Sequence, residues 1–201
     1  MTTILKNRLE TTAFEIKSNE IINLEIVYKR ESLLKKIAGR PNFVGMLCAL
    51  ELLDGEMVWL LYNDENARAC TLATLNCYEG KDKRSNVVNI NTPFLHDVKR
   101  IWIFADYNRL DYDDTWDRTK AEMMIFIPGY DTIQIPFISQ GDERVYCLVC
   151  TIDIEDAKRL LIQPKMEFVD NFNDLISKYN LNGIESGGAN YFEEGGIGLQ
   201  W

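Results

Sequence analysis

The feature that most constrains this chain is the stretch of residues 86–107, which holds two runs of β-prone residues joined by a connector that contains Pro93. The second run is apolar at each of its first four positions: Ile101, Trp102, Ile103 and Phe104. Side chains of a strand point alternately to its two sides, so consecutive apolar residues are typical of a strand covered on both faces. We therefore expect this run to lie at the centre of the core.

The rest of the chain favours short strands over helices. Residues 12–28 alternate between apolar and polar side chains around a turn at residues 18–20, which predicts a half-buried hairpin. The Asp54-Gly55 pair predicts a second hairpin. Residues 63–84 are polar and are predicted to be irregular. Brief helices are predicted at residues 30–38, 153–163 and 171–179 from their apolar spacing.

Together these segments amount to about nine strands and three helices, which indicates a mainly β fold. We predict a two-sheet β-sandwich with a few short peripheral helices, formed by residues 1–182 as a single domain. Residues 183–201 form a tail that holds six of the twelve glycines together with Tyr191, Phe192 and Trp201. Such a tail cannot build its own core. It either moves freely or lies against the domain or a partner, in which case its three aromatic residues are candidate interaction residues.

The charge of the chain excludes some partners. The formal net charge is −9, whereas phosphate contacts require clustered Lys and Arg. The densest basic cluster, Lys81, Lys83 and Arg84, is short and interrupted by Asp82. We expect no nucleic-acid partner. No run approaches the roughly 18 apolar residues of a membrane span, and the first residues lack the apolar core of a secretory signal.

Five cysteines form an odd set without the spacing of a disulfide scaffold. Cys48, Cys147 and Cys150 lie within apolar runs, where a free thiol behaves as a small hydrophobic group. Cys147 and Cys150 have the spacing of a redox or zinc motif, but on a regular strand positions i and i+3 face opposite sides. We expect buried structural cysteines and a reducing, cytoplasmic location.

An acidic loop contains the best candidate ligands for a metal. Asp111, Asp113, Asp114 and Asp117 supply the carboxylate oxygens that calcium prefers. Counted from Asp111, Trp116 occupies the sixth position of the loop, where a helix–loop–helix calcium site needs glycine. The two remaining interpretations are an irregular calcium site and a solvated loop.

The sequence offers no catalytic signature. His96 is the only histidine, and it lies in a connector without a neighbouring nucleophile, which favours a surface histidine. No phosphate-binding, dinucleotide-binding or serine-nucleophile motif is present. We expect no catalytic residue and no bound organic cofactor. A weaker reading is a hydrolase that uses a metal held by the acidic loop.

The order of these segments resembles the TerD-like family of tellurium-resistance and bacterial stress proteins, which are calcium-binding β-sandwiches. The resemblance covers residues 14–169. It rests on the opening strands at residues 14–24, the segment from Phe43 through Asp54-Gly55 to Asn63, the stretch from Val87 to Ile103, the strand from Val145 to Thr151, and Met166 to Phe168. The closest match is Val87 to Ile90 followed by Val98 to Ile103.

The chain departs from the family at the calcium site. Leu75, Asn76 and Cys77, then Arg84, Ser85 and Asn86, stand where the family carries acidic elements, and residues 41–43 replace a further Asp-x-Asp. The resemblance therefore implies a divergent member whose family calcium site is degenerate. It implies a non-enzymatic stress-response module that acts through protein contacts. The alternative is a structural or assembly protein, including a phage-related one, whose tail docks on a neighbouring subunit.

Overall fold

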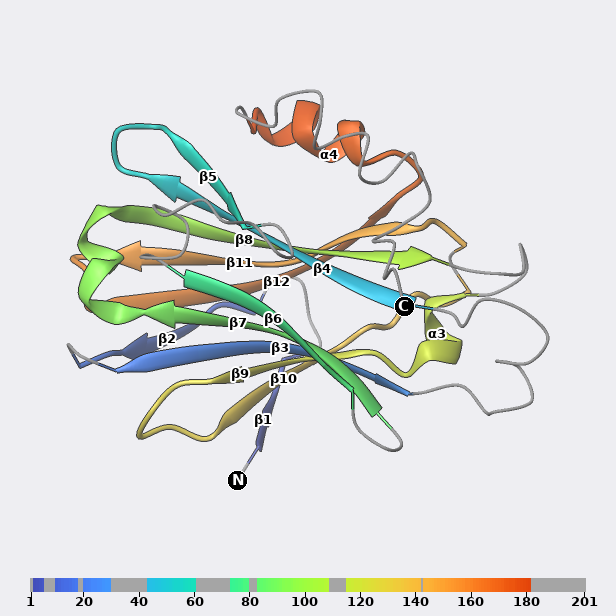
Figure 1. Cartoon of the computed structure of the whole chain (residues 1–201), viewed down its shortest axis with the longest axis horizontal. Helices are drawn as coiled ribbons and strands as arrows, with labels where there is room; N and C mark the ends of the chain where they lie inside the picture. Colours follow the sequence, from blue (N-terminus) through green and yellow to red (C-terminus); the bar gives the residue numbers. More distant parts are fainter. Residues whose placement is uncertain are drawn as a thin grey trace.

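The computed structural model describes residues 2–5, 10–17, 20–29, 43–60, 73–79, 83–108, 115–141 and 143–181. In this part of the chain two six-stranded sheets pack face to face, as Figure 1 shows. The predicted two-sheet β-sandwich is therefore confirmed. The predicted helix at residues 30–38 and the tail at residues 183–201 lie outside the described residues.

The chain passes several times between the two sheets. In spatial order, the first sheet contains β1 (Thr2–Ile4), β10 (Thr132–Pro136), β9 (Glu122–Phe126), β3 (Ile21–Lys29), β7 (Lys83–Asn91) and β6 (Ala73–Glu79). The second sheet contains β2 (Thr12–Glu15), β12 (Arg159–Val169), β11 (Tyr146–Glu155), β8 (Val98–Asn108), β4 (Phe43–Leu52) and β5 (Met57–Leu60). The pairing of β1 with β10 is parallel, and the other strand pairs are antiparallel.

The main core lies between the sheets, and alternate residues of most of the described strands enter it. In β3 these residues are Ile22, Leu24, Ile26 and Tyr28. β8 pairs with both β4 and β11, and it sends Ile101 and Ile103 into this core. Trp102 and Phe104 of the same strand are also buried, but on the outer face of the second sheet. The prediction of a strand covered on both faces is confirmed.

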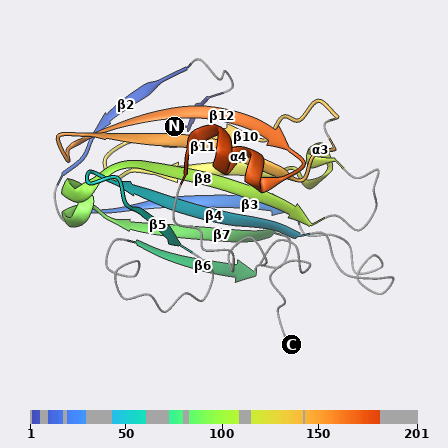
Figure 2. The same ribbon diagram turned by 90° about the horizontal axis from the view of Figure 1, so that it is seen from above.

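The outer face of β8 is covered by helix α4 (Phe172–Tyr179), which lies over β8 and β11 in Figure 2. The ring centroids of Phe104 and Phe172 are 5.3 Å apart, and those of Trp102 and Tyr179 are 5.1 Å apart. Asn171 caps the helix, because its side chain accepts a hydrogen bond from the Asn173 backbone at 2.9 Å. The sequence predicted this helix, and the aromatic contacts explain why it docks on the sheet.

Two other short helices occur in the described residues. The 3-10 helix η1 (Thr92–Asp97) connects β7 to β8, and helix α3 (Trp116–Thr119) precedes β9. The predicted hairpin at Asp54-Gly55 is confirmed as the turn between β4 and β5.

The secondary structure predicted for three segments was wrong. Residues 153–163 form no helix, because β11 continues to Glu155 and β12 begins at Arg159 after a tight turn. Asp156 and Ala157 in that turn have positive φ angles of 51° and 54°, as in the hairpin turns that match strand twist. The buried residues Leu160 and Ile162 alternate with period two, whereas the pair Leu160 and Leu161 suggested a helical face.

The segment of residues 12–28 is not a hairpin, since β2 pairs with β12 in the second sheet and β3 pairs with β7 and β9 in the first. The polar segment of residues 63–84 contains a strand, β6, which pairs only with β7 among the described strands. Hydrogen bonds to one neighbour hold this edge strand, so its sequence need not alternate clearly.

Candidate interaction surface

One end of the sandwich is built around η1, where the chain crosses from the first sheet to the second. The buried hydroxyl of Thr92 accepts a hydrogen bond from the Glu20 backbone at 2.9 Å and donates one to the Glu20 carbonyl at 2.7 Å. The Leu53 backbone donates to the Asp97 carbonyl at 2.9 Å. These bonds fasten η1 to the start of β3 and to the β4–β5 turn, while Leu95 is buried beneath it.

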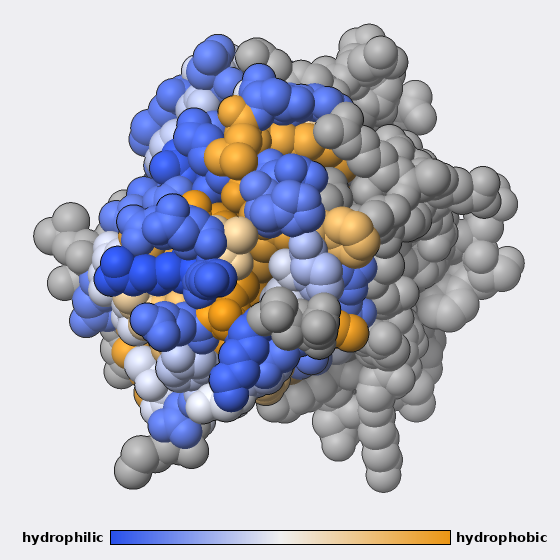
Figure 3. All heavy atoms as spheres, turned by 90° about the vertical axis from the view of Figure 1, so that its left-hand side faces the viewer, coloured by the Kyte–Doolittle hydropathy of each residue, from blue (hydrophilic) through white to orange (hydrophobic). Residues whose placement is uncertain are grey.

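Three large apolar side chains are exposed on these fastened segments. Ile21 at the start of β3 is 52% exposed, Leu53 in the β4–β5 turn 67%, and Phe94 in η1 37%. We call these three residues the crossover patch. Figure 3 views this end of the molecule and shows apolar surface between hydrophilic side chains. Single exposed apolar residues are common on protein surfaces, so the reason to consider these three together is that hydrogen bonds join the segments that carry them.

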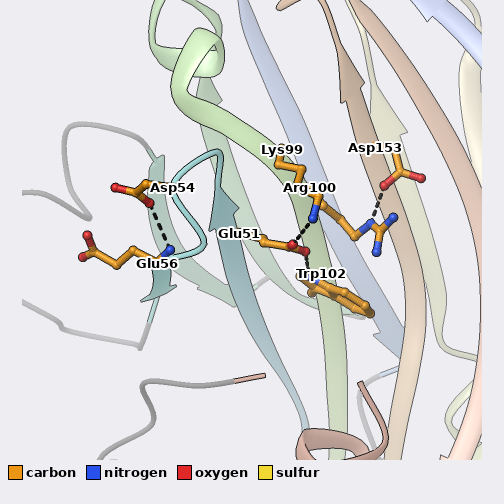
Figure 4. Close-up of polar contacts among 7 residues, drawn as sticks. All are labelled: Glu51, Asp54, Glu56, Lys99, Arg100, Trp102 and Asp153. Atoms are coloured by element: carbon orange, nitrogen blue, oxygen red, sulfur yellow. Dashed lines mark hydrogen bonds and ion pairs between the residues drawn. The ribbon is translucent and has the colours of Figure 1, made fainter. Parts of the chain in front are cut away.

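A polar network lies beside the crossover patch on the outer face of the second sheet (Figure 4). Glu51 accepts hydrogen bonds from Lys99 Nζ at 2.6 Å and from Trp102 Nε1 at 3.3 Å. Arg100 donates from Nε to Asp153 and lies over the Trp102 ring, with 5.1 Å between its guanidinium carbon and the ring centroid. Glu51, Arg100 and Asp153 are register neighbours on β4, β8 and β11.

These contacts give the surface the composition of a small protein interface. It combines exposed apolar side chains with charged ones, and hydrogen bonds hold the backbone of its segments. Within the β4–β5 turn, Asp54 Oδ1 accepts from the Glu56 backbone at 3.0 Å, which fixes the turn that carries Leu53. The arrangement can therefore present its apolar side chains without first having to become ordered.

Of the four acidic residues predicted to bind a metal, the described residues include Asp117 alone. Its carboxylate accepts hydrogen bonds from the backbones of Ser139 at 3.1 Å and Gly141 at 2.9 Å. Burial acts to raise the pKa of Asp117, but these hydrogen bonds and the charge of Lys120 outweigh it and lower the pKa. Asp117 therefore stabilises the turn after β10. Asp111, Asp113 and Asp114 lie outside the described residues, as do Tyr191, Phe192 and Trp201.

Cys48, Cys147 and Cys150 are buried as predicted, but the prediction that Cys147 and Cys150 face opposite sides of the strand was wrong. Both Cys147 and Cys150 point into the main core, because an extra residue in β11, Val149, forms a bulge that shifts the alternation by one. Burial raises the pKa of the Cys150 thiol to about 12 and raises the pKa of Cys48 as well. Cys48, Cys147 and Cys150 are all buried, and none of the three forms a disulfide bond.

Leu75 and Asn86 are two of the residues that stand where the TerD-like family carries the acidic elements of its calcium site. Asn86 is buried, and its side-chain amide donates to the Val44 carbonyl across the two sheets at 2.7 Å. Leu75 packs against the main core. A hard divalent cation requires several anionic oxygens, and these two side chains offer none. In the described part of the chain, no group of three or more His, Cys, Asp or Glu residues could hold a metal ion.

His96 lies on the surface, as predicted, with a ring nitrogen 2.8 Å from the Pro93 carbonyl within η1. The crossover patch itself was not predicted. Leu53 follows a strand and Phe94 follows a proline. Considered alone, each is typical of an ordinary connector between two strands. The sequence feature that could have indicated the crossover patch was an apolar residue next to a turn signal. No helix in the described part of the chain is long and apolar enough to cross a membrane.

The comparisons with known proteins agree with this architecture. No family model matches the chain, and no curated protein matches it. The structure is similar to that of SAV2460, a protein of unknown function, with a TM-score of 0.56 and 12% sequence identity over 80% of this chain and 96% of that one. It is also similar to SCO6318 from Streptomyces coelicolor A3(2), a homologue of the telluride resistance protein TerD. That match has a TM-score of 0.52 and 8% identity, over 80% of this chain and 96% of the other. The chain thus has a TerD-like fold with a strongly divergent sequence.

Proposed function

We propose that this TerD-like domain is a non-enzymatic binding module that acts through contacts with another protein in a stress response of the tellurium-resistance type. The crossover patch carries the proposal. Ile21, Leu53 and Phe94 expose apolar surface on segments that hydrogen bonds from Thr92 and Leu53 hold in place. Exposing such side chains to water is unfavourable, and a partner that covers them recovers that free energy.

The chemistry of the nucleophilic groups supports a role without catalysis. A thiol reacts as its thiolate, and the raised pKa of Cys150 keeps this buried group protonated at neutral pH. His96 is exposed at the surface, and its two ring nitrogens lie near the Pro93 carbonyl and, at 3.4 Å, the Asp97 carboxylate. Neither residue is arranged as a nucleophile with an adjacent base.

The proposal does not require the family's calcium. The amide of Asn86 is committed to Val44, and Leu75 is part of the packing. Any metal contribution would have to come from the loop that contains Asp111, Asp113, Asp114 and Asp117. Calorimetric titration of calcium into chelator-stripped protein tests that contribution separately, and dedicated calcium sites would give a Kd below about 100 µM.

Site-specific photo-crosslinking in the producing cells tests the proposal. A benzoylphenylalanine is placed at position 94, and in a matched control at position 138, since Ile138 is also exposed and apolar but lies beyond the end of β10. We expect a discrete adduct with one other protein from position 94 and none from position 138. Equal labelling at both positions, or none, would contradict the proposal. An adduct of two copies of this chain would favour the assembly alternative.

A further inference from the structure

We propose that strand β6 (Ala73–Glu79) is a self-association site, where it pairs in antiparallel fashion with β6 of a second copy of this chain. The first sheets of the two copies then join edge to edge about a two-fold axis. This inference goes beyond the proposed function, because it uses neither the crossover patch nor the partner that the patch binds. It is drawn from a comparison of the strands at the edges of the two sheets.

β6 is the longest of the four edge strands in the described part of the chain. The first sheet ends at β1 and β6, and the second ends at β2 and β5. β1 has three residues, β2 and β5 have four each, and β6 has seven. Short edge strands limit pairing with another chain, because they present few backbone N–H and C=O groups to it. β6 lacks this protection, and Figure 2 shows it as the outermost strand on its side of the sandwich.

β6 also lacks the other features that keep an edge strand from pairing. Natural edges are guarded by lysine and other charges, by proline and by bulges. The six residues from Ala73 to Tyr78 include no charge and no proline, and Glu79 is the only charged residue of the strand. The seven residues pair with β7 in consecutive register, from Ala73 opposite Ile90 to Glu79 opposite Arg84, without a bulge. The strand therefore offers a regular and nearly neutral backbone edge.

The domain holds β6 in place before a second strand arrives. β6 is paired with β7 along its whole length. Ala73 is 1% exposed within the main core, and Leu75 packs against that core. An edge that is ordered in advance loses less conformational entropy when another strand adds to it. Addition of a strand to the edge of a sheet is a recurring mode of protein recognition.

The sequence of β6 favours a second copy as the added strand. Two identical strands can pair antiparallel about a two-fold axis, which gives a closed dimer. When the axis passes through Asn76, the middle residue, all seven residues of each strand face a residue of the other. Ala73 of each copy then faces Glu79 of the other, so no like charges oppose each other along the pair. Because the chain has a net charge of −9, a nearly neutral contact also limits the repulsion between two copies.

Sedimentation velocity of the full chain tests the inference. We expect the wild type to dimerise with a Kd on the order of 100 µM or tighter, because one pair of edge strands buries a small area. Asn76→Lys and Asn76→Glu each place two like charges opposite each other at the axis, and each should weaken the dimer about fivefold or more. An equimolar mixture of the two variants should restore the dimer, because opposite charges then meet.

Asn173→Lys is the matched control for the added charge. Asn173 is exposed on α4, which covers the second sheet, so this variant should change the Kd by less than about twofold. Thermal melting shows whether each variant remains folded.

Disulfide trapping tests the register in a Cys70→Ser, Cys77→Ser background. Residues that face each other across antiparallel strands have Cα atoms about 4.5 to 5.5 Å apart, a separation that a disulfide spans. Mild oxidation should therefore crosslink two copies of the Asn76→Cys variant. Thr74→Cys should not crosslink, because Thr74 of each copy faces Tyr78 of the other and its own counterpart lies about 13 Å further along the strand.

Three outcomes would overturn the inference. The first is a wild type that stays monomeric up to about 500 µM, well above the expected Kd. The second is a dimer that Asn76→Lys and Asn173→Lys weaken equally or not at all, which would place the contact on another surface or show a general effect of charge. The third is trapping of Thr74→Cys but not of Asn76→Cys, which would exclude the two-fold axis at Asn76. None of these outcomes depends on what is captured by crosslinking at position 94, so the proposed function is tested separately.

Discussion

The carboxylate of Asp106 occupies the space that a side chain at position 45 would fill. The two residues are register partners on β8 and β4, and a Cβ added to Gly45 would overlap Asp106 Oδ1 and would lie 2.8 Å from Cγ. Because Cγ is also too close, turning the carboxylate about its last bond would not relieve the overlap. The glycine is therefore required by its neighbour.

Gly45→Ala should lower the free energy of unfolding by about 1 to 3 kcal/mol, which is typical of overpacking. Urea denaturation measures the change. In the double variant with Asp106→Ala the space is free, so the effect of Gly45→Ala should fall to within about 0.5 kcal/mol of zero. Equal effects of Gly45→Ala in both backgrounds would contradict the steric account.

The same carboxyl group should make stability depend on pH. Asp106 is partly buried as a residue, and burial raises the pKa of its carboxyl from 3.8 to about 6. The folded state therefore holds this proton more tightly than the unfolded state. Its stabilising effect is complete below pH 3.8 and is lost as the pH rises through 6.

Asp106→Asn removes this titration and nearly keeps the size of the side chain. At pH 7 the variant should be more stable than the wild type by about 1 kcal/mol or more, since one pKa unit corresponds to about 1.4 kcal/mol. Thermal melting of both proteins from pH 4 to pH 7 gives the comparison. Parallel curves, or a wild type that is more stable at pH 7, would show that the carboxyl group is not destabilised by burial.

Asp117 should have the opposite pH dependence, because its folded pKa is lowered. Its carboxylate accepts two backbone hydrogen bonds, from Ser139 and Gly141, and that stabilisation is present above the ordinary pKa of 3.8 and lost as the pH falls below it. Asp117→Asn should cost roughly 1 kcal/mol at pH 7. The difference between variant and wild type should shrink at pH 3.

The exposed Asp170, at the end of β12, provides the control for this experiment. Asp170→Asn should change stability by less than about 0.5 kcal/mol at either pH. A similar loss for both variants would indicate a general effect of net charge and would remove the specific role of Asp117.

The sequence was informative where the local pattern alone determines the outcome. Alternation predicted the buried face of β3, and the apolar run at Ile101 predicted a strand covered on both sides. The sequence pattern failed where one extra residue shifts the alternation of side chains between the two faces of a strand. Val149 is such a residue, and its bulge turns Cys147 and Cys150 to the same face. A bulge depends on the neighbouring strands and has no clear sequence signal.

The crossover patch could not be predicted for a related reason. The exposure of Leu53 and Phe94 depends on which segments meet at η1. The sequence places these two residues about forty positions apart, and the pairing of β4 with β8 and the hydrogen bond between the Leu53 backbone and the Asp97 carbonyl connect their segments. The pattern of residues 86–107 predicted the two strands that η1 joins but not that they belong to different sheets.

The attachment of α4 to the second sheet gives a final prediction, centred on Glu167. Its carboxylate accepts from the Tyr179 hydroxyl at 2.7 Å and from Lys178 Nζ at 2.5 Å. Tyr179→Phe keeps the ring that lies against Trp102 and removes the hydroxyl, so we expect a loss of about 1 kcal/mol and faster amide hydrogen exchange in α4. Lys178 is 56% exposed, and Lys178→Met should cost less than about 0.5 kcal/mol because exposed ion pairs contribute little. Exchange in α4 that responds more strongly to Lys178→Met than to Tyr179→Phe would show that charge, and not the partly buried hydroxyl, holds the helix on the sheet.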